Sequence, residues 1–211
     1  MRFKSMAAIV GAVMFMATTV WAGNNPTQIT WNFNSPAGIL GTSQTYTVDG
    51  ITLTAYGFSS PGNPTDLYGK NSGGDEKGLG INGLSNDEIG GTSFIQLNLS
   101  QLLAQYNTGF LTLGSVQKGE NYDVWLSSGL GTLGTEIVTN GTLDQIQFPV
   151  SLVKGSPYLG ISAGSSGNVL LGSLSVNQTP EPTTLALFGT GLILAAFLFR
   201  RYDRTPSRIE A

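Results

Sequence analysis

Short apolar alternations separated by glycine-rich turns constrain the fold of this chain more than any other feature. The stretch DQIQFPVSL at residues 144–152 has apolar side chains at alternate positions, and ITLTAYGF (51–58), FIQLNLS (94–100) and NYDVWLS (121–127) show the same pattern. A period of two places alternate side chains on opposite faces of a strand. The side chains expected to face the core are Ile51, Leu53, Ala55, Ile95, Leu97, Leu99, Tyr122, Val124, Leu126, Ile146, Phe148, Val150 and Leu152.

Weaker alternations and turn signals extend this pattern along the chain. Dipeptides typical of hairpin turns, such as Asn140-Gly141, separate the segments. About nine or ten short strands predict a mainly β fold, an antiparallel β-sandwich or jelly roll. Pro149 cannot donate to a strand ladder, so the strand around it is expected at an edge or a bulge. The weaker segments are 45–48, 110–116, 135–139, 158–163 and 168–176.

The region between the two ends, residues 23–179, is acidic and has neither cysteine nor histidine. Four lysines, no arginine and ten acidic residues give it a net charge of −6. Such a surface cannot neutralise several phosphates, which excludes nucleic acid as a partner. Without histidine the usual general base and zinc ligand are missing, which excludes histidine-dependent triads and zinc hydrolases. Without cysteine the core must hold the domain together without disulfides.

Residues 1–22 are predicted to be a secretory signal peptide. Arg2 and Lys4 precede an apolar stretch that is short for a spanning helix, and small residues allow cleavage after Ala22. The alternative is an uncleaved N-terminal anchor. Residues 24–178 are then the predicted β-sandwich domain.

An uncharged apolar run at residues 183–199 predicts a single C-terminal transmembrane helix. Apolar residues would occupy all sides of this helix, which is not the pattern of a surface helix. A basic tail follows at 200–211, and the positive-inside rule keeps it cytoplasmic. The β domain is therefore expected outside the membrane, with the helix spanning it at least transiently.

Two prolines stand just before this run. Pro180 and Pro182 favour extended geometry around Glu181, which places its side chain on a stiff spacer. On physical grounds alone, this spacer suits either recognition by a processing enzyme or simple separation of the domain from the bilayer.

The tail at residues 179–204 resembles the PEP-CTERM sorting signal. Pro180, Glu181 and Pro182, then the apolar run, then Arg200 and Arg201, occur in the order of that signal. The resemblance implies an exported bacterial protein that an exosortase-type enzyme cleaves near the proline pair. GLGI (78–81) followed by NDEI (86–89) is also similar to a pattern in exported domains with this tail, which are mostly uncharacterised β-sandwiches.

Residues 59–93 show little alternation and are predicted to form one long loop. Connections longer than about 12–15 residues are usually functional or disordered, so a ligand is expected here first. Carboxylate and amide oxygens among glycines suit Ca²⁺, and the alternative is a loop of solvated acidic side chains. The candidate calcium ligands are Asp75, Glu76, Asn86, Asp87 and Glu88.

Candidates for other chemistry are few. Trp125 and Tyr68 are the candidates for stacking on a sugar ring, and the favoured alternative for Trp125 is cover of the core or of an edge. A glycan hydrolase needs paired carboxylates, and Glu120 and Asp123, which are close in sequence, match a turn and an outward position.

The leading expectation for function is an exported, non-catalytic cell-surface or extracellular-matrix protein processed through its C-terminal signal. The alternative is a carbohydrate-binding module with a calcium-stiffened loop, and a glycan hydrolase comes third. The expected partners are an exosortase-type enzyme, the membrane and extracellular polysaccharide.

Overall fold

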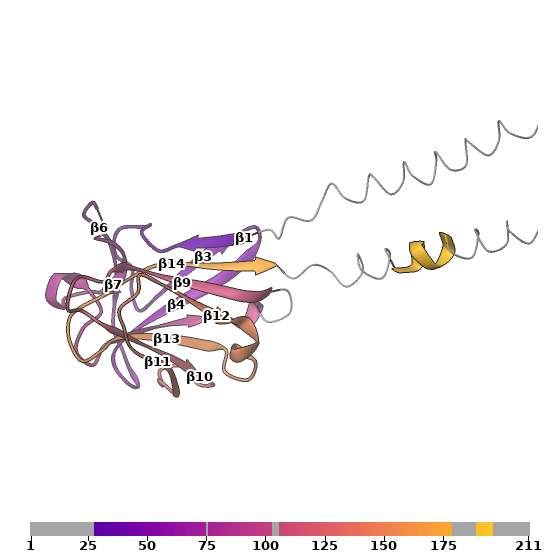
Figure 1. The fold of residues 1–211 in the computed structure, drawn as a ribbon. Helices are drawn as coiled ribbons and strands as arrows, with labels where there is room; N and C mark the ends of the chain where they lie inside the picture. Colours follow the sequence, from indigo (N-terminus) through magenta and orange to yellow (C-terminus); the bar gives the residue numbers. More distant parts are fainter. Residues whose placement is uncertain (1–27, 75, 103–105, 179–188, 196–211) are drawn as a thin grey trace, which may run out of the picture. The chain divides into compact units, whose positions relative to one another are not determined.

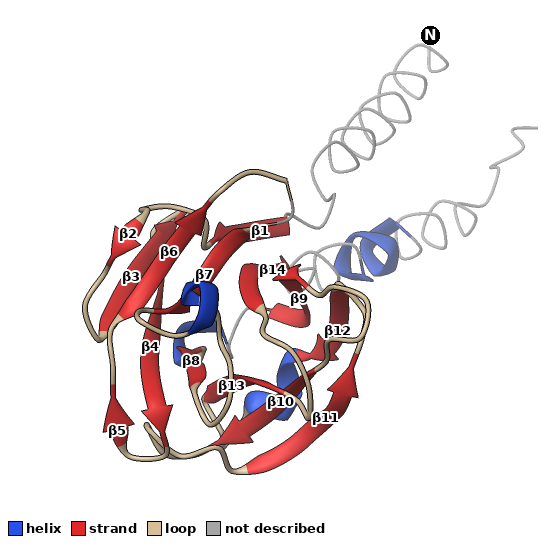
Figure 2. Ribbon diagram, turned by 90° about the vertical axis from the view of Figure 1, so that its left-hand side faces the viewer, coloured by secondary structure: helices blue, strands red, loops and turns tan. Residues whose placement is uncertain are grey.

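The computed structural model describes residues 28–74, 76–102, 106–178 and 189–195. Residues 28–178 form two antiparallel sheets, each with seven strands in this part of the chain (Figures 1 and 2). Sheet A has the order β12 (Gln145–Pro149), β9 (Tyr106–Ser115), β14 (Leu170–Gln178), β7 (Lys77–Ile81), β6 (Leu67–Asn71) and β2 (Gly38–Ile39), and β1 (Gln28–Asn32) pairs with β14. Sheet B has the order β11 (Thr135–Gly141), β10 (Tyr122–Ser127), β13 (Tyr158–Ala163), β8 (Phe94–Asn98), β4 (Ile51–Ser60) and β3 (Ser43–Val48), and β5 (Asn63–Pro64) pairs with β4.

The two sheets form a sandwich-like fold, which confirms the predicted mainly β class. Three short 3₁₀ helices lie in the connections: η1 (Ser85–Asp87), η2 (Ser100–Leu102) and η3 (Val150–Val153). One continuous apolar core contains side chains from both sheets, including Trp31 and Leu174 from sheet A and Leu53 and Val124 from sheet B.

Two of the four strongest alternations, in β10 and at the centre of β4, are confirmed as half-buried strands, whereas β8 is buried on both faces. On β10, Tyr122, Val124 and Leu126 are buried, while Asp123 and Trp125 between them are partly exposed. The same alternation holds at the centre of β4, where Leu53 and Ala55 are buried. The threonines between and beside them point outward and pair with threonines of β3. The cause in each case is the two-residue period of the strand.

The strand that contains Pro149 lies at the edge of sheet A, as predicted, but it is shorter than predicted. β12 ends at Pro149, and η3 begins at the next residue. Val150 is buried as expected, whereas Leu152 is 47% exposed and does not face the core. The change of period explains the difference, since residues two apart in a 3₁₀ turn do not share a face.

The prediction that residues 59–93 form one long loop is wrong. This segment contains β5, β6, β7 and η1, and β6 and β7 pair as an antiparallel hairpin inside sheet A. Glycine allows other backbone segments to pack against this hairpin. A Cβ on Gly80 would lie 2.0 Å from the Asp87 carbonyl oxygen, and a Cβ on Gly78 would lie 2.5 Å from the Leu171 carbonyl oxygen. Because glycine has no side chain, such a strand shows little apolar alternation in the sequence.

A separate unit comprises the two ends of the chain, Met1–Pro26 and Thr179–Ala211. Its described residues form a helix at 189–195, inside the span 183–199 that was expected to be helical. Among the helices of the described residues, none combines the length and the apolar character that a membrane crossing requires. The predicted signal peptide at 1–22, with its cleavage residue Ala22, lies outside the described residues.

Candidate functional site

A partly buried charge cluster lies on sheet A and is built around one lysine. The Lys70 Nζ atom lies 2.5 Å from Glu76 Oε2 and 2.5 Å from Glu88 Oε1. The exposed fractions of the three side chains are 12% for Lys70, 32% for Glu76 and 4% for Glu88. One cation therefore holds two carboxylates together, of which Glu88 has little access to water and Glu76 is partly exposed.

The β6–β7 hairpin brings the first two of these groups together. Lys70 on β6 pairs with Gly78 on β7, so Glu76, which comes just before β7, reaches back to the same end of the hairpin. The turn between them is closed by a hydrogen bond from the Ser72 N–H to the Glu76 carbonyl at 3.1 Å.

The third group comes from the connection between β7 and β8. After η1 the chain passes so close to β7 that the Asp87 carbonyl fills the space where a side chain on Gly80 would be. Glu88 follows directly and is buried, and Ile89 then forms a bridge with Val169 just before β14. The backbone on both sides of Glu88 is thus held against sheet A.

The surroundings shift the pKa values of the two glutamates in opposite directions. Burial raises the pKa of Glu88 above its usual range. The hydrogen bond from Lys70 lowers the pKa of Glu76, and a hydrogen bond from Ser115 adds to that effect. Burial disfavours the charged form of Lys70, but its hydrogen bonds to both glutamates outweigh this and raise its pKa. These shifts favour the charged forms of Lys70 and Glu76. Of the two glutamates, Glu88 is the one whose neutral form is favoured.

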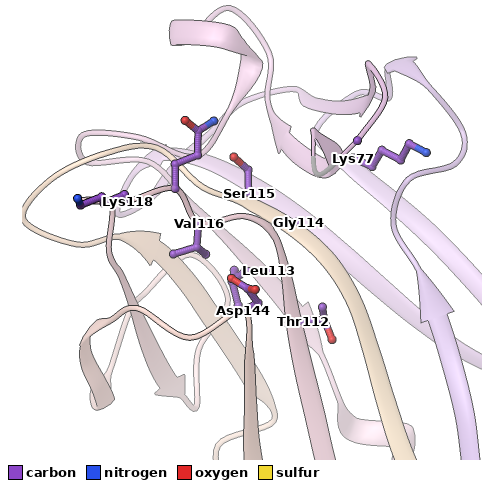
Figure 3. A pocket seen from close by; sticks show the side chains of 10 residues that line it. Lys77, Thr112, Leu113, Gly114, Ser115, Val116, Lys118 and Asp144 are labelled. Atoms are coloured by element: carbon purple, nitrogen blue, oxygen red, sulfur yellow. The ribbon is translucent and has the colours of Figure 1, made fainter.

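An open depression of about 610 Å³ lies beside the cluster, at the end of β9. Glu76 connects the two features, because its Oε1 accepts hydrogen bonds from Ser115 Oγ at 3.2 Å and from Gln117 Nε2 at 3.0 Å. Figure 3 shows Lys77 and Lys118 on opposite sides of the depression, with Asp144 between them. The lining residues are Gly74, Lys77, Thr112, Leu113, Gly114, Ser115, Val116, Gln117, Lys118 and Asp144.

The candidate calcium ligands are not gathered around one position in the described part of the chain. Glu76 and Glu88 are held by Lys70, while Asp87 Oδ1 accepts a hydrogen bond from the Gly83 N–H at 2.9 Å. Asn86 is exposed, and Asp75 lies outside the described residues. Among the residues that the structure describes, no three acidic side chains form a group suited to a metal ion. Calcium binding stays a prediction, and two of its five candidate ligands, Glu76 and Glu88, pair with the Lys70 ammonium.

The two aromatic side chains proposed for sugar stacking lie on different sheets. Trp125 is on β10 of sheet B, is partly exposed, and donates from Nε1 to Ser162 Oγ at 3.0 Å. Tyr68 is on β6 of sheet A, opposite Ile39 in the register with β2. They cannot form one platform together, since each sheet presents its own outer face, so a role in glycan binding remains a prediction for each residue separately.

The loop between β10 and β11 covers part of the outer face of sheet B. The Gln96 side chain holds this loop by accepting a hydrogen bond from the Gly131 N–H at 2.6 Å and donating to the Thr132 carbonyl at 2.5 Å. Gln96 is fully buried as a result. The face on which Trp125 lies is therefore already partly occupied by the chain itself.

Sequence reasoning missed the residues that assemble the cluster. Lys70 was placed in a featureless loop, and Ser115 and Gln117 belong to the end of β9, far from Glu76 in the sequence. The only available signal was the presence of Lys70 and Glu76 on either side of a glycine-containing turn, which is the pattern of a hairpin. Glu88 was grouped with Glu76 among the candidate calcium ligands, but nothing in the sequence linked it to Lys70.

Comparison with known proteins gives one informative match. Residues 178–201 match the PEP-CTERM protein-sorting motif. This range includes the predicted sorting residues Pro180, Glu181, Pro182, Arg200 and Arg201, all of which lie outside the described residues. No curated protein matches the chain. Among solved structures, the K1 cleaved adhesin domain of Lys-gingipain from Porphyromonas gingivalis is 15% identical, with a TM-score of 0.27, over 72% of this chain and 95% of that one. A likeness of this degree carries no argument about function.

Proposed function

Because the chain carries a PEP-CTERM sorting motif, which implies export and processing by an exosortase, we propose that it is a non-catalytic cell-surface or extracellular-matrix protein. The observation that carries this proposal is the position of the motif. It begins at residue 178, where β14, the last strand of the sandwich, ends. The linear signal thus follows the folded domain directly, so cleavage near the proline pair would leave the domain intact.

The surroundings of the carboxylates support a non-catalytic role. The carboxylate of Glu120 accepts a hydrogen bond from the Gln117 N–H at 2.8 Å, and that of Asp123 accepts one from the Asn140 N–H at 2.7 Å. Glu120 therefore stabilises its own turn, and Asp123 links β10 to β11. Glu76 and Glu88 are bound to Lys70, which leaves neither positioned to act on a substrate in solution.

We expect Glu181→Ala to abolish processing of the tail in cells that contain the matching exosortase. The reason is that Glu181 stands between the two prolines of the matched motif, near the expected cleavage point. The measurement is intact mass together with cell fractionation. Wild-type protein should end near Pro180 and leave the membrane fraction, whereas the variant should keep its full tail.

Glu136→Ala is the matched control, since Glu136 is an exposed glutamate on β11 and lies outside the motif. It should be processed like the wild type. Wild-type protein that retains its whole tail in these cells would falsify the proposed sorting.

A second candidate function is binding of extracellular polysaccharide in the depression at the end of β9. The observation that favours it is the lining, in which hydroxyl, amide, ammonium and carboxylate groups surround a hollow of about 610 Å³. Two of the four lysines of the domain, Lys77 and Lys118, belong to this lining. Such groups suit a polar ligand, and an anionic sugar could pair with the lysines.

For this second function, Lys118→Ala, which removes one of the two ammonium groups of the lining, should weaken retention on the exopolysaccharide of the producing bacterium by about 10- to 100-fold. A hydrogen bond to a charged group contributes about 1.5–3 kcal/mol, which corresponds to that change in affinity. Glu136→Ala, which alters sheet B, should bind like the wild type. Equal retention of all three proteins would exclude the depression as the site.

If calcium stiffens the domain, CaCl₂ should also raise its melting temperature.

A further inference from the structure

The cluster of Lys70, Glu76 and Glu88 has the composition and geometry of a site for covalent bond formation. A primary amine lies 2.5 Å from a carboxyl oxygen of Glu88, and a second carboxylate, that of Glu76, lies 2.5 Å from the same nitrogen. The carboxyl carbon of Glu88 is one covalent bond beyond that oxygen. The nitrogen is therefore close to the ~3–3.5 Å from the carbon that a near-attack arrangement requires.

We propose that Lys70 and Glu88 become joined by an intramolecular amide bond between Lys70 Nζ and Glu88 Cδ, with Glu76 as the proton acceptor. This modification goes beyond the proposed function and does not depend on it. It requires no cofactor, oxidant or partner, because all three reacting groups are already in contact.

The reaction balances within the cluster. Glu76 takes one proton from the Lys70 ammonium, and the resulting amine attacks Cδ of the Glu88 carboxylic acid. The N–C bond forms, the C–O bond to the Glu88 hydroxyl breaks, and that hydroxyl leaves as water with a second proton from the nitrogen. The amide retains the third proton of the original ammonium. Glu76 finally releases its extra proton to solvent.

The difference in burial assigns the roles of the two glutamates. Glu88 is only 4% exposed, and burial favours its neutral acid, which is the form that an amine can attack. Glu76 is 32% exposed and is connected through Ser115 and Gln117 to the depression. A proton taken up by Glu76 therefore has a route to water.

Exclusion of water favours the bond once it forms. In water an amine and a carboxylic acid remain an ion pair, but a buried ion pair loses much of its hydration, whereas an amide is neutral. With the Lys70 side chain 12% exposed and Glu88 4% exposed, little water can reach the new bond and hydrolyse it.

The amide bond would supply a covalent cross-link, which disulfides cannot supply in this domain. The chain contains no cysteine, so it has no disulfide. An amide between Lys70 and Glu88 would tie β6 to the connection after η1 and close the loop formed by the β6–β7 hairpin. A cross-link of this kind restricts the unfolded chain, as a disulfide does.

The test is mass spectrometry of the full chain, purified after export and digested with trypsin. We expect a branched peptide that contains both Lys70 and Glu88, lighter than the sum of its two parts by the mass of one water molecule. Lys70→Arg should retain a cation but yield only separate, unmodified peptides, since a guanidinium stays protonated. Glu76→Gln should also lack the branched peptide, because its amide cannot accept the proton.

Lys154→Arg is the control, since Lys154 is exposed and lies outside the cluster. It should retain the branched peptide. Circular dichroism of each variant will establish whether it folds. Recovery of Lys70 and Glu88 of the folded wild type in separate, full-mass peptides would overturn the proposal and leave the cluster as an ion pair.

Discussion

Replacing Trp31 with alanine is expected to lower the free energy of unfolding by about 3–5 kcal/mol, the cost of removing a large aromatic side chain from a packed core. Trp31 is 0% exposed and lies on β1, which pairs with β14 in sheet A. Its Nε1 donates to the Ile51 carbonyl at 3.3 Å, on the first residue of β4 in sheet B. The side chain thus connects the two sheets, and urea unfolding of the purified domain should show the loss.

Trp125→Ala is the matched control for this prediction. Trp125 has the same side chain but lies partly exposed on the outer face of β10. We expect its replacement to cost about 1 kcal/mol, the typical effect of a single substitution. Similar losses for the two variants would contradict the assignment of Trp31 to the core between the sheets.

Replacing Gly114 with alanine should destabilise the domain by about 3 kcal/mol, even though alanine adds a single methyl group. A Cβ at Gly114 would lie at 1.9 Å from the Lys77 carbonyl oxygen, a backbone atom of β7 that cannot rotate away. The strands β7 and β9 would have to separate at the floor of the depression. Thermal unfolding should show a lower melting temperature, and any ligand of the depression should bind more weakly.

Gly160→Ala provides the comparison for Gly114→Ala. Gly160 lies on β13, and the nearest atom to a Cβ there would be Cβ of Trp125 at 3.4 Å, an ordinary contact. This variant should change stability by about 1 kcal/mol at most, the typical effect of a single substitution. If Gly114→Ala is equally well tolerated, the close approach of β7 to β9 is not required for the fold.

The strands with alternating side chains were predictable because their signal is local. On β10, whether a side chain faces the core depends only on the two-residue period, so Val124 and Trp125 could be assigned to opposite faces from the sequence. The edge position of β12 was predictable for a similar reason. Pro149 lacks the N–H that an inner strand needs at every position, and this property belongs to the residue itself.

The hairpin of β6 and β7 was not predictable in the same way. Gly69, Gly78 and Gly80 occur in these two strands, and the absence of their side chains allows other backbone segments to approach. For Gly69, the Pro36 carbonyl oxygen lies 2.0 Å from where its Cβ would be. Glycine near turns normally indicates a loop, and only the packed neighbours show that here it indicates a strand.

The charge cluster, like the strands, was predictable only in part from the sequence. Glu76 and Glu88 were two of five candidate calcium ligands in the sequence, and in the structure the Lys70 ammonium of the same chain pairs with both. The identity of that cation depends on the register of β6 against β7, which pairs Lys70 with Gly78. Register is set by contacts across the sheet, and these cannot be inferred from spacing along the chain.

The sequence by itself determined the fold class, the acidic and cysteine-free character of the domain, and the sorting address at residues 178–201. These properties depend on composition, local period or a linear motif, each of which is complete in a short stretch of chain. Only the tertiary structure decided which charges meet, where the depression lies, and that Trp125 and Tyr68 belong to different sheets. The physical reason is that burial and ion pairing act between groups brought together by strand pairing, often from distant parts of the chain.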